Sequence, residues 1–147
     1  MKGVNVSRYD KYNNLSGGFR APLNAAWNAT SGPSGVTDLY RVTGVSTNGS
    51  GRLIRATNVL AVAGILIAHG PKNAGDIVDV MTDGEVVELD ALDLQANTAP
   101  VPGTKYYLDV TAGRLTATAP GTGVNGFYVG QTVEAGRLIV RCQQIQG

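Results

Sequence analysis

Residues 105–141 read KYYLDVTAGRLTATAPGTGVNGFYVGQTVEAGRLIVR, and this stretch decides the fold class. It contains two pairs of short segments rich in aromatic and β-branched residues, and each pair is joined by an Ala-Gly step, at 112–113 and at 135–136. Strand-like runs on either side of a glycine-containing turn are typical of β-hairpins. We therefore predict antiparallel hairpins over 105–117 and 127–141.

The same signal predicts two further hairpins closer to the N-terminus. One forms at an Asn-Gly step and the other at an Asp-Gly step, which are the strongest short-range hairpin signals. The strand-like segments are 40–45 and 52–55 around Asn48-Gly49, and 76–81 and 85–89 around Asp83-Gly84.

The remaining segments of the second part of the chain are less regular. The apolar run 59–68 is compatible with a helix or with buried strands, and its β-branched residues and the break at Gly64 favour strands. For residues 91–103 we predict a helical turn or a loop. Because strands outnumber every other element and the hairpin spacing is irregular, residues 37–147 are predicted to form an all-β body, a small barrel or sandwich arranged as a meander.

Residues 1–36 have a different character and predict an extended N-terminal arm. Their apolar residues are scattered among Gly, Asn, Ser and Pro without helical or strand periodicity, apart from a weak helical turn from Pro22 to Asn28. The arm nevertheless holds four of the nine aromatic residues of the chain. A free tail gains nothing by exposing large rings, so these side chains either bind a partner or pack against the chain's own β body.

Charge is strongly segregated along the chain. Residues 1–72 contain eight Lys/Arg and two Asp/Glu, whereas residues 73–147 contain four Lys/Arg and nine Asp/Glu. The formal net charge of +1 conceals this polarity. Two fields of opposite sign favour docking against an acidic partner surface or against a sister subunit, and they predict assembly that is sensitive to salt.

Sequence motifs for chemistry are weak. Residues 121–126 match GxGxxG, but a strand-like segment follows instead of the helix that a phosphate site needs. A calcium loop starting at Asp79 would place Met81 at a ligand position and Asp90 where a bidentate Glu is usual. His69 and Cys142 are each the only residue of their type. We therefore expect no enzyme activity, no metal and no cofactor.

The sequence also bears on membranes and nucleic acids. The longest apolar run, 59–68, is too short to span a bilayer, and the first thirty residues lack the apolar core of a secretory signal, so we expect synthesis and folding in the cytoplasm. The cations and aromatic rings of the arm could bind nucleic acid by stacking. Their charge density is low and the body is acidic, so no nucleic-acid partner is expected.

Four phrases between residues 74 and 141, about half of the chain, carry a family resemblance. They are Ala74-Gly75-Asp76-Ile77-Val78 with Asp83-Gly84, Pro102-Gly103-Thr104-Lys105-Tyr106-Tyr107-Leu108, Gly113-Arg114-Leu115-Thr116, and Val129-Gly130-Gln131 followed by Arg137-Leu138-Ile139-Val140. The segment resembles the β-rich module of capsid decoration (cement) proteins of tailed bacteriophages. The resemblance implies a non-enzymatic virion protein, often trimeric, that sits on the outer surface of the icosahedral head and ties neighbouring major capsid proteins together.

Two sets of site residues follow from composition and position combined with this resemblance. The first is a capsid-binding set in the arm, with rings as apolar anchors and cations as ionic contacts: Arg8, Tyr9, Lys11, Tyr12, Phe19, Arg20 and Trp27. The second is an acidic surface between subunits: Asp76, Asp79, Asp83, Glu85 and Glu88. The expected partners are the phage major capsid protein and further copies of this chain, with a trimer expected. The alternatives are a phage tail or head-fibre protein and a glycan-binding β module.

Overall fold

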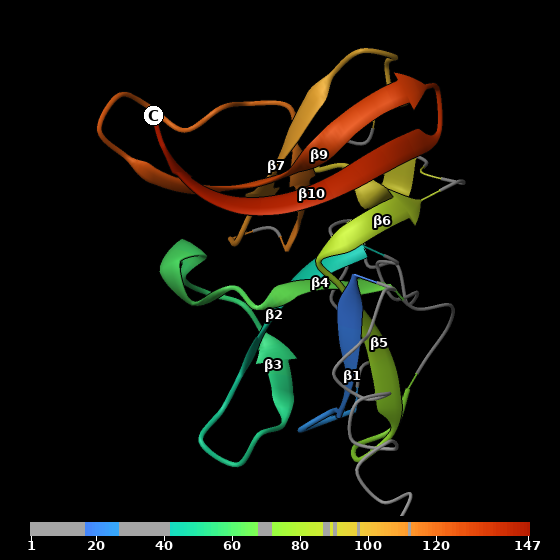
Figure 1. Cartoon of the computed structure of the whole chain (residues 1–147), viewed down its shortest axis with the longest axis vertical. Coiled ribbons are helices and arrows are strands. Elements are labelled where there is room, and N and C mark those ends of the chain that lie inside the picture. The colour runs from blue at the N-terminus through green and yellow to red at the C-terminus, as the bar shows by residue number, and fades with distance from the viewer. Residues whose placement is uncertain are drawn as a thin grey trace, which may run out of the picture.

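The computed structural model describes residues 17–26, 42–67, 72–86, 89, 91–96, 98–111 and 113–147. Within these residues, ten strands form two five-stranded antiparallel sheets, and the helical segments are two short 3-10 turns (Figure 1). The all-β prediction is therefore confirmed, and two sheets fit the sandwich form of it.

The first sheet has the strand order β1-β5-β4-β2-β3. A bridge between Leu23, which follows β1, and Leu53 in β3 links the two outer strands at one end of the sheet. The strands are β1 (Gly18–Pro22), β2 (Val42–Thr47), β3 (Leu53–Arg55), β4 (Gly64–Ile67) and β5 (Ile77–Met81).

The second sheet has the order β6-β10-β9-β7-β8. Its strands are β6 (Asp83–Val86), β7 (Lys105–Asp109), β8 (Arg114–Thr116), β9 (Asn125–Glu134) and β10 (Arg137–Gln146). The predicted hairpins β7-β8 and β9-β10 both form, as does the hairpin β2-β3 in the first sheet. Gly113 and Gly136 close the turns of the second sheet at φ of 74° and 84°, a region that glycine enters without steric cost.

The hairpin predicted at Asp83-Gly84 is wrong. Strand β5 pairs with β1 and β4, whereas β6 pairs with β10, so the chain passes from the first sheet to the second at Thr82. Burial explains this outcome, because Val80 lies in the core of the first sheet and Val86 in the core of the second. The meander is also wrong, since both sheets contain neighbours that are not consecutive in the chain.

The predictions for the two irregular segments, 59–68 and 91–103, agree with the structure to different extents. Residues 59–68 begin with the 3-10 turn η1 (Val59–Ala61), in which the Asn58 side chain accepts a hydrogen bond from Leu60 N at 3.0 Å, and only their second half forms strand β4. The predicted strands are thus correct for half of the run. The turn η2 (Ala91–Asp93) confirms the helical turn expected at the start of 91–103. Pro22, predicted to begin a helical turn, instead ends β1.

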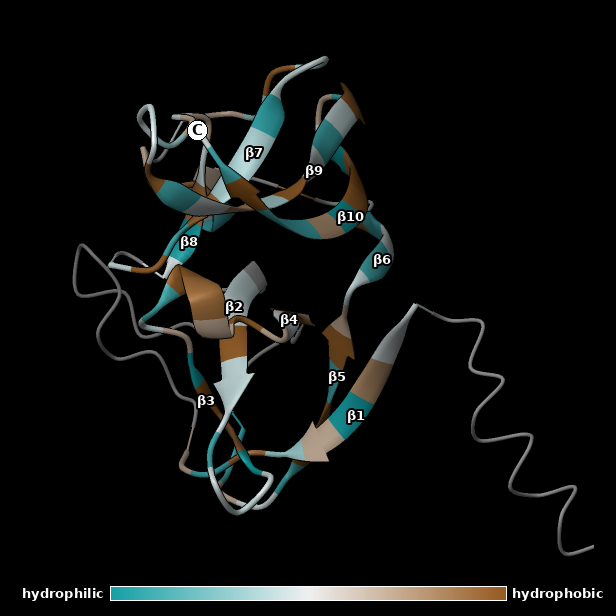
Figure 2. Ribbon diagram, turned by 60° about the vertical axis from the view of Figure 1, so that its left-hand side comes forward, coloured by the Kyte–Doolittle hydropathy of each residue, from teal (hydrophilic) through white to brown (hydrophobic). Residues whose placement is uncertain are grey.

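Two hydrophobic cores lie side by side and share strand β4. Leu66 is buried in the core of the first sheet and its neighbour Ile65 in the core of the second, because successive side chains of a strand point to opposite faces. Figure 2 shows the second sheet above the first, with hydrophilic and hydrophobic stretches following one another along β10. A hydrogen bond from Arg55 Nη2 to Thr111 O, at 2.7 Å, also joins the two sheets.

Candidate functional surface

The predicted capsid-binding residues are only partly described. Phe19 and Arg20 lie in β1, which pairs with β5 as an outer strand of the first sheet. Phe19 packs against the core of that sheet. Of the two roles expected for the aromatic residues of the arm, Phe19 therefore has the second, packing against the chain's own body. The other five members lie outside the described residues: Arg8, Tyr9, Lys11, Tyr12 and Trp27.

Arg20 and Asp79 belong to the two predicted contact sets, and they contact each other. They are directly opposite in the β1-β5 register, and Arg20 Nε lies 2.9 Å from Asp79 Oδ1. Their side chains are 67% and 73% exposed, so solvent screens the pair and its contribution to stability is below about 1 kcal/mol. A partner that binds here meets a preformed ion pair rather than separate charges.

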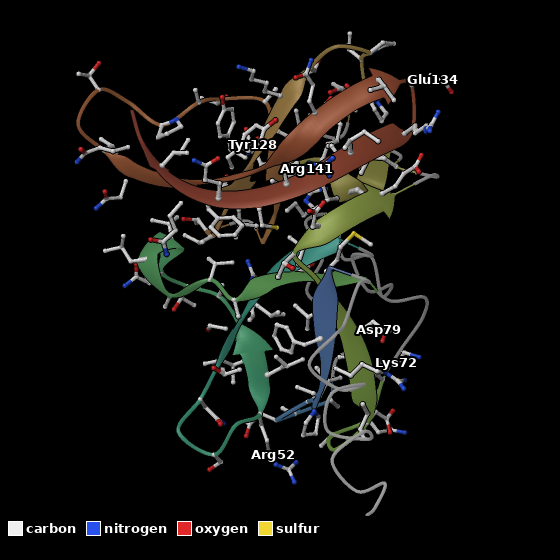
Figure 3. The ribbon with its side chains drawn as sticks, viewed as in Figure 1. Arg52, Lys72, Asp79, Tyr128, Glu134 and Arg141 are labelled. Atoms are coloured by element: carbon white, nitrogen blue, oxygen red, sulfur yellow. The ribbon has the colours of Figure 1, made fainter. Side chains whose placement is uncertain are left out.

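Three of the remaining acidic residues, Asp76, Asp83 and Glu85, also have partners within the chain. Asp83 and Glu85, on β6, accept hydrogen bonds from Arg141 and Arg137 on the neighbouring strand β10. The hydrogen bond and the charge of Glu85 raise the pKa of Arg137. Asp76 accepts a hydrogen bond from Asn73 N at 2.8 Å and closes a turn, while Glu88 lies outside the described residues. Figure 3 shows Asp79 beside the first sheet and Arg141 on the second.

The outward face of the second sheet carries an aromatic pair that the sequence reasoning missed. The rings of Tyr107 (β7) and Tyr128 (β9) are directly opposite in register and pack edge to face, with centroids 5.7 Å apart. Burial and Tyr107 raise the pKa of Tyr128, and nearby Arg141 opposes that shift. The alternation of buried and exposed positions in the two predicted strands would have placed both rings on one outward face.

Two other titratable side chains, those of Arg114 and Cys142, are buried or half-buried. Arg114 is buried and its Nη2 donates to Gln95 O at 3.0 Å, next to the bridge between Leu94 and Leu115. Cys142 is half-buried, and burial raises the pKa of its thiol to about 12. At neutral pH this thiol is protonated and a poor nucleophile.

The described residues contain no group of three or more His, Cys, Asp or Glu side chains arranged to hold a metal ion. His69 lies outside these residues. Among the helical segments that the structure describes, none has the length and hydrophobicity needed to span a bilayer.

Comparison with solved structures reveals the same fold in a chain from Mycobacterium phage Patience. The superposition has a TM-score of 0.61 at 18% sequence identity and covers 94% of this chain and 96% of the other. The shared fold thus extends over almost the full length of both chains. No protein-family model matches the sequence, and the curated proteins contain no match to it.

Proposed function

We propose that this chain is a structural protein of a phage particle that binds the outer surface of the icosahedral head. There it stabilises the capsid by clamping neighbouring major capsid proteins, without catalysing a reaction. The observation that carries the proposal is the fold shared over 94% of the chain with a chain from a mycobacteriophage. The decoration-protein resemblance of residues 74–141, which contribute to both sheets, supports the same conclusion.

A clamp of this kind needs several modest contacts rather than one deep pocket. Two linked binding regions reach a high combined affinity because the second contact forms at a high effective concentration. An extended arm is suited to one of these regions, since its backbone can add to the edge of a partner's sheet while alternate side chains fill pockets. The β body supplies the second region.

The two contact sets take different roles in this proposal. The arm residues Arg8, Tyr9, Lys11, Tyr12 and Trp27 bind the major capsid protein, with the rings as anchors and the cations facing an acidic shell. The carboxylates near β5 and β6 face the next copy of the chain in a homotrimer. Since Asp79, Asp83 and Glu85 already pair with arginines of their own chain, subunit contacts there must rearrange or share those ion pairs.

The first test removes the arm without removing part of the body. Deletion of residues 1–16 retains β1, whereas deletion of 1–36 would also remove the buried residue Leu23 and the strand that pairs with β5. We expect the shorter deletion to fold and to bind phage heads that lack this protein far more weakly than the full chain does. Undiminished binding by a folded deletion variant would exclude the arm as a capsid contact.

The second test locates the protein in the particle. In electron micrographs of virions labelled with an antibody against this chain, we expect the label to cover the whole head. Label restricted to one vertex or to the tail would favour the alternative of a tail or head-fibre protein. The mass of the purified chain in solution, alone and bound to heads, then tests the proposed trimer.

A further inference from the structure

The segment that enters β1 is held at one carbonyl group. Gly17 O accepts hydrogen bonds from Thr82 N at 2.7 Å, from Thr82 Oγ1 at 2.8 Å and from Asp83 N at 2.8 Å. Three donors on one acceptor are unusual, because a carbonyl oxygen has two lone pairs. Residue 17 is therefore held firmly at the point where residues 1–16 join the body.

The sequence at this point suits the contact. Gly17 has a φ of 68°, and a Cβ atom there would lie 2.3 Å from Asp83 O. A Cβ atom on Gly18 would lie 2.2 Å from Val80 O. Real Cβ atoms do not approach backbone oxygens this closely, so the Gly-Gly pair is what allows the entering segment to lie against the end of β5.

Thr82 is also the residue at which the chain passes between the two sheets. It separates β5 of the first sheet from β6 of the second, and its carbonyl accepts a hydrogen bond from Cys142 N of β10 at 2.9 Å. Gly17, Thr82, Asp83 and Cys142 thus form one hydrogen-bonded cluster, which we call the Gly17 junction. The junction ties the start of the first strand to both sheets.

We propose that the Gly17 junction is a positioning site that fixes where residues 1–16 leave the β body, so that the arm and the body engage one capsid surface together. This inference rests on the proposed function. A fixed exit point raises the effective concentration of the arm at its site once the body is bound, because fewer arm positions miss that site. Gly17 and Thr82 contribute to capsid binding in this way without touching the capsid.

The contacts of the Gly17 junction support a role in positioning the arm over a role limited to covering the edge of the first sheet. The junction joins Gly17 to β6 and β10 as well as to the end of β5, so the point where the arm begins is fixed relative to the second sheet and not only to β5. A junction that served β1 alone would need only the β1-β5 ladder, which already contains five residue pairs.

The test compares Thr82→Val with Thr82→Ser, both in the full chain and in the chain that lacks residues 1–16. Valine keeps the branched shape but loses the hydroxyl donor, whereas serine keeps the donor. In the full chain we expect Thr82→Val, which removes one of the three donors that fix the exit point, to weaken binding to undecorated heads by up to about tenfold, the limit set by the free energy of one hydrogen bond. Thr82→Ser should bind nearly as well as the original. In the deleted chain the two variants should bind alike.

A second variant applies a stronger perturbation. Gly17→Ala places a methyl group against Asp83 O and should weaken binding more than Thr82→Val does. Gly51→Ala is the matched control, because Gly51 also has a positive φ, 76°, and its Cβ would meet nothing within 4 Å. Chemical unfolding of each variant shows whether the body remains folded. Should Gly17→Ala fail to fold, the Thr82 pair still decides.

Three results would overturn the inference. Equal binding of Thr82→Val and the original full chain would show that the junction does not position the arm. An equal loss in the chain without residues 1–16 would show that the residue acts through the body alone. A full, folded chain that does not bind heads at all would overturn the proposed function as well, and so the two failures are distinguishable.

Discussion

The two sheets of this protein have the same number of strands but are assembled in different ways. In the second sheet, four of the five strands belong to the hairpins β7-β8 and β9-β10, with Gly113 and Gly136 at their turns. In the first sheet, β1 pairs with β5, a strand far along the chain, and β2 pairs with β4 across the intervening β3. Local turn chemistry organises one sheet, whereas long-range burial organises the other.

The hydrophobic cores of the two sheets also differ, in the number of buried side chains that they contain. Among the side chains that the structure describes, eleven are buried in the core of the second sheet and six in that of the first. The first sheet therefore depends more on each of its contacts, including those of Phe19 and Leu23 from the segment before β2. The comparison suggests that the second sheet stabilises the first through β4, whose neighbouring residues enter both cores.

The largest expected effect tests whether the sheets unfold together. Leu66→Ala, in the first core, and Leu138→Ala, in the second, should each lower the free energy of unfolding by about 2–5 kcal/mol, because both side chains are completely buried. Both variants should unfold in one cooperative transition, as measured by far- and near-ultraviolet circular dichroism in urea. Val133→Ala, at an exposed position of β9, is the control. Two separate transitions would show that the sheets are independent units.

A smaller effect is expected at the contact between the sheets. A Cβ atom on Gly44 in β2 would lie 2.1 Å from Leu108 Cδ2 in β7, so Gly44→Ala should cost about 1–3 kcal/mol in urea unfolding. Because the obstruction is a side chain, adding Leu108→Ala should remove part of that penalty, and a double-mutant cycle measures the coupling. Additive effects of the two substitutions would argue against this contact between the sheets.

Alkaline pH provides a test within the second sheet. Burial, together with the charge of Asp83, raises the pKa of the Cys142 thiol from 9.0 to about 12. Between those values the unfolded chain loses the thiol proton while the folded chain keeps it, so this group contributes stability below pH 9 that is lost as the pH rises toward 12. Cys142→Ala should therefore show a shallower loss of stability over that range than the original chain. Identical slopes would contradict the assignment.

The smallest effect concerns the exposed ion pairs. Arg20→Gln and Asp79→Asn in the first sheet should show a coupling energy of about 0.2–1 kcal/mol in a double-mutant cycle, and the pair Arg141 and Asp83 in the second should behave alike. Both couplings should fall in 1 M salt. A larger coupling that is indifferent to salt would mean that these pairs are more than solvated surface charges.

For much of the candidate surface, the sequence predicted only which charged and aromatic residues are present and not how they are arranged. The sequence shows that Arg20 is basic and that Asp79 is acidic, and it predicts a strand around Asp79 but none around Arg20. The register that places the two residues opposite each other depends on the pairing of β1 with β5. Tyr107 and Tyr128 were within reach of strand alternation, because their positions in the predicted strands already place them on the outward face. The Gly17 junction had only one sequence signal, the Gly-Gly pair at 17–18.

The sequence by itself determined the all-β class, three of the hairpins and the segregation of charge, because turn residues and strand periodicity act over a few neighbouring positions. Only the tertiary structure decided that Asp83-Gly84 is part of a strand, that β1 belongs to the body and that three residues of the predicted acidic surface, Asp79, Asp83 and Glu85, pair with the chain's own arginines. These features depend on which apolar faces are buried against which core, and that burial is a property of the whole chain. An Asp-Gly step favours a turn, but the burial of Val80 and Val86 in different cores outweighs that local preference.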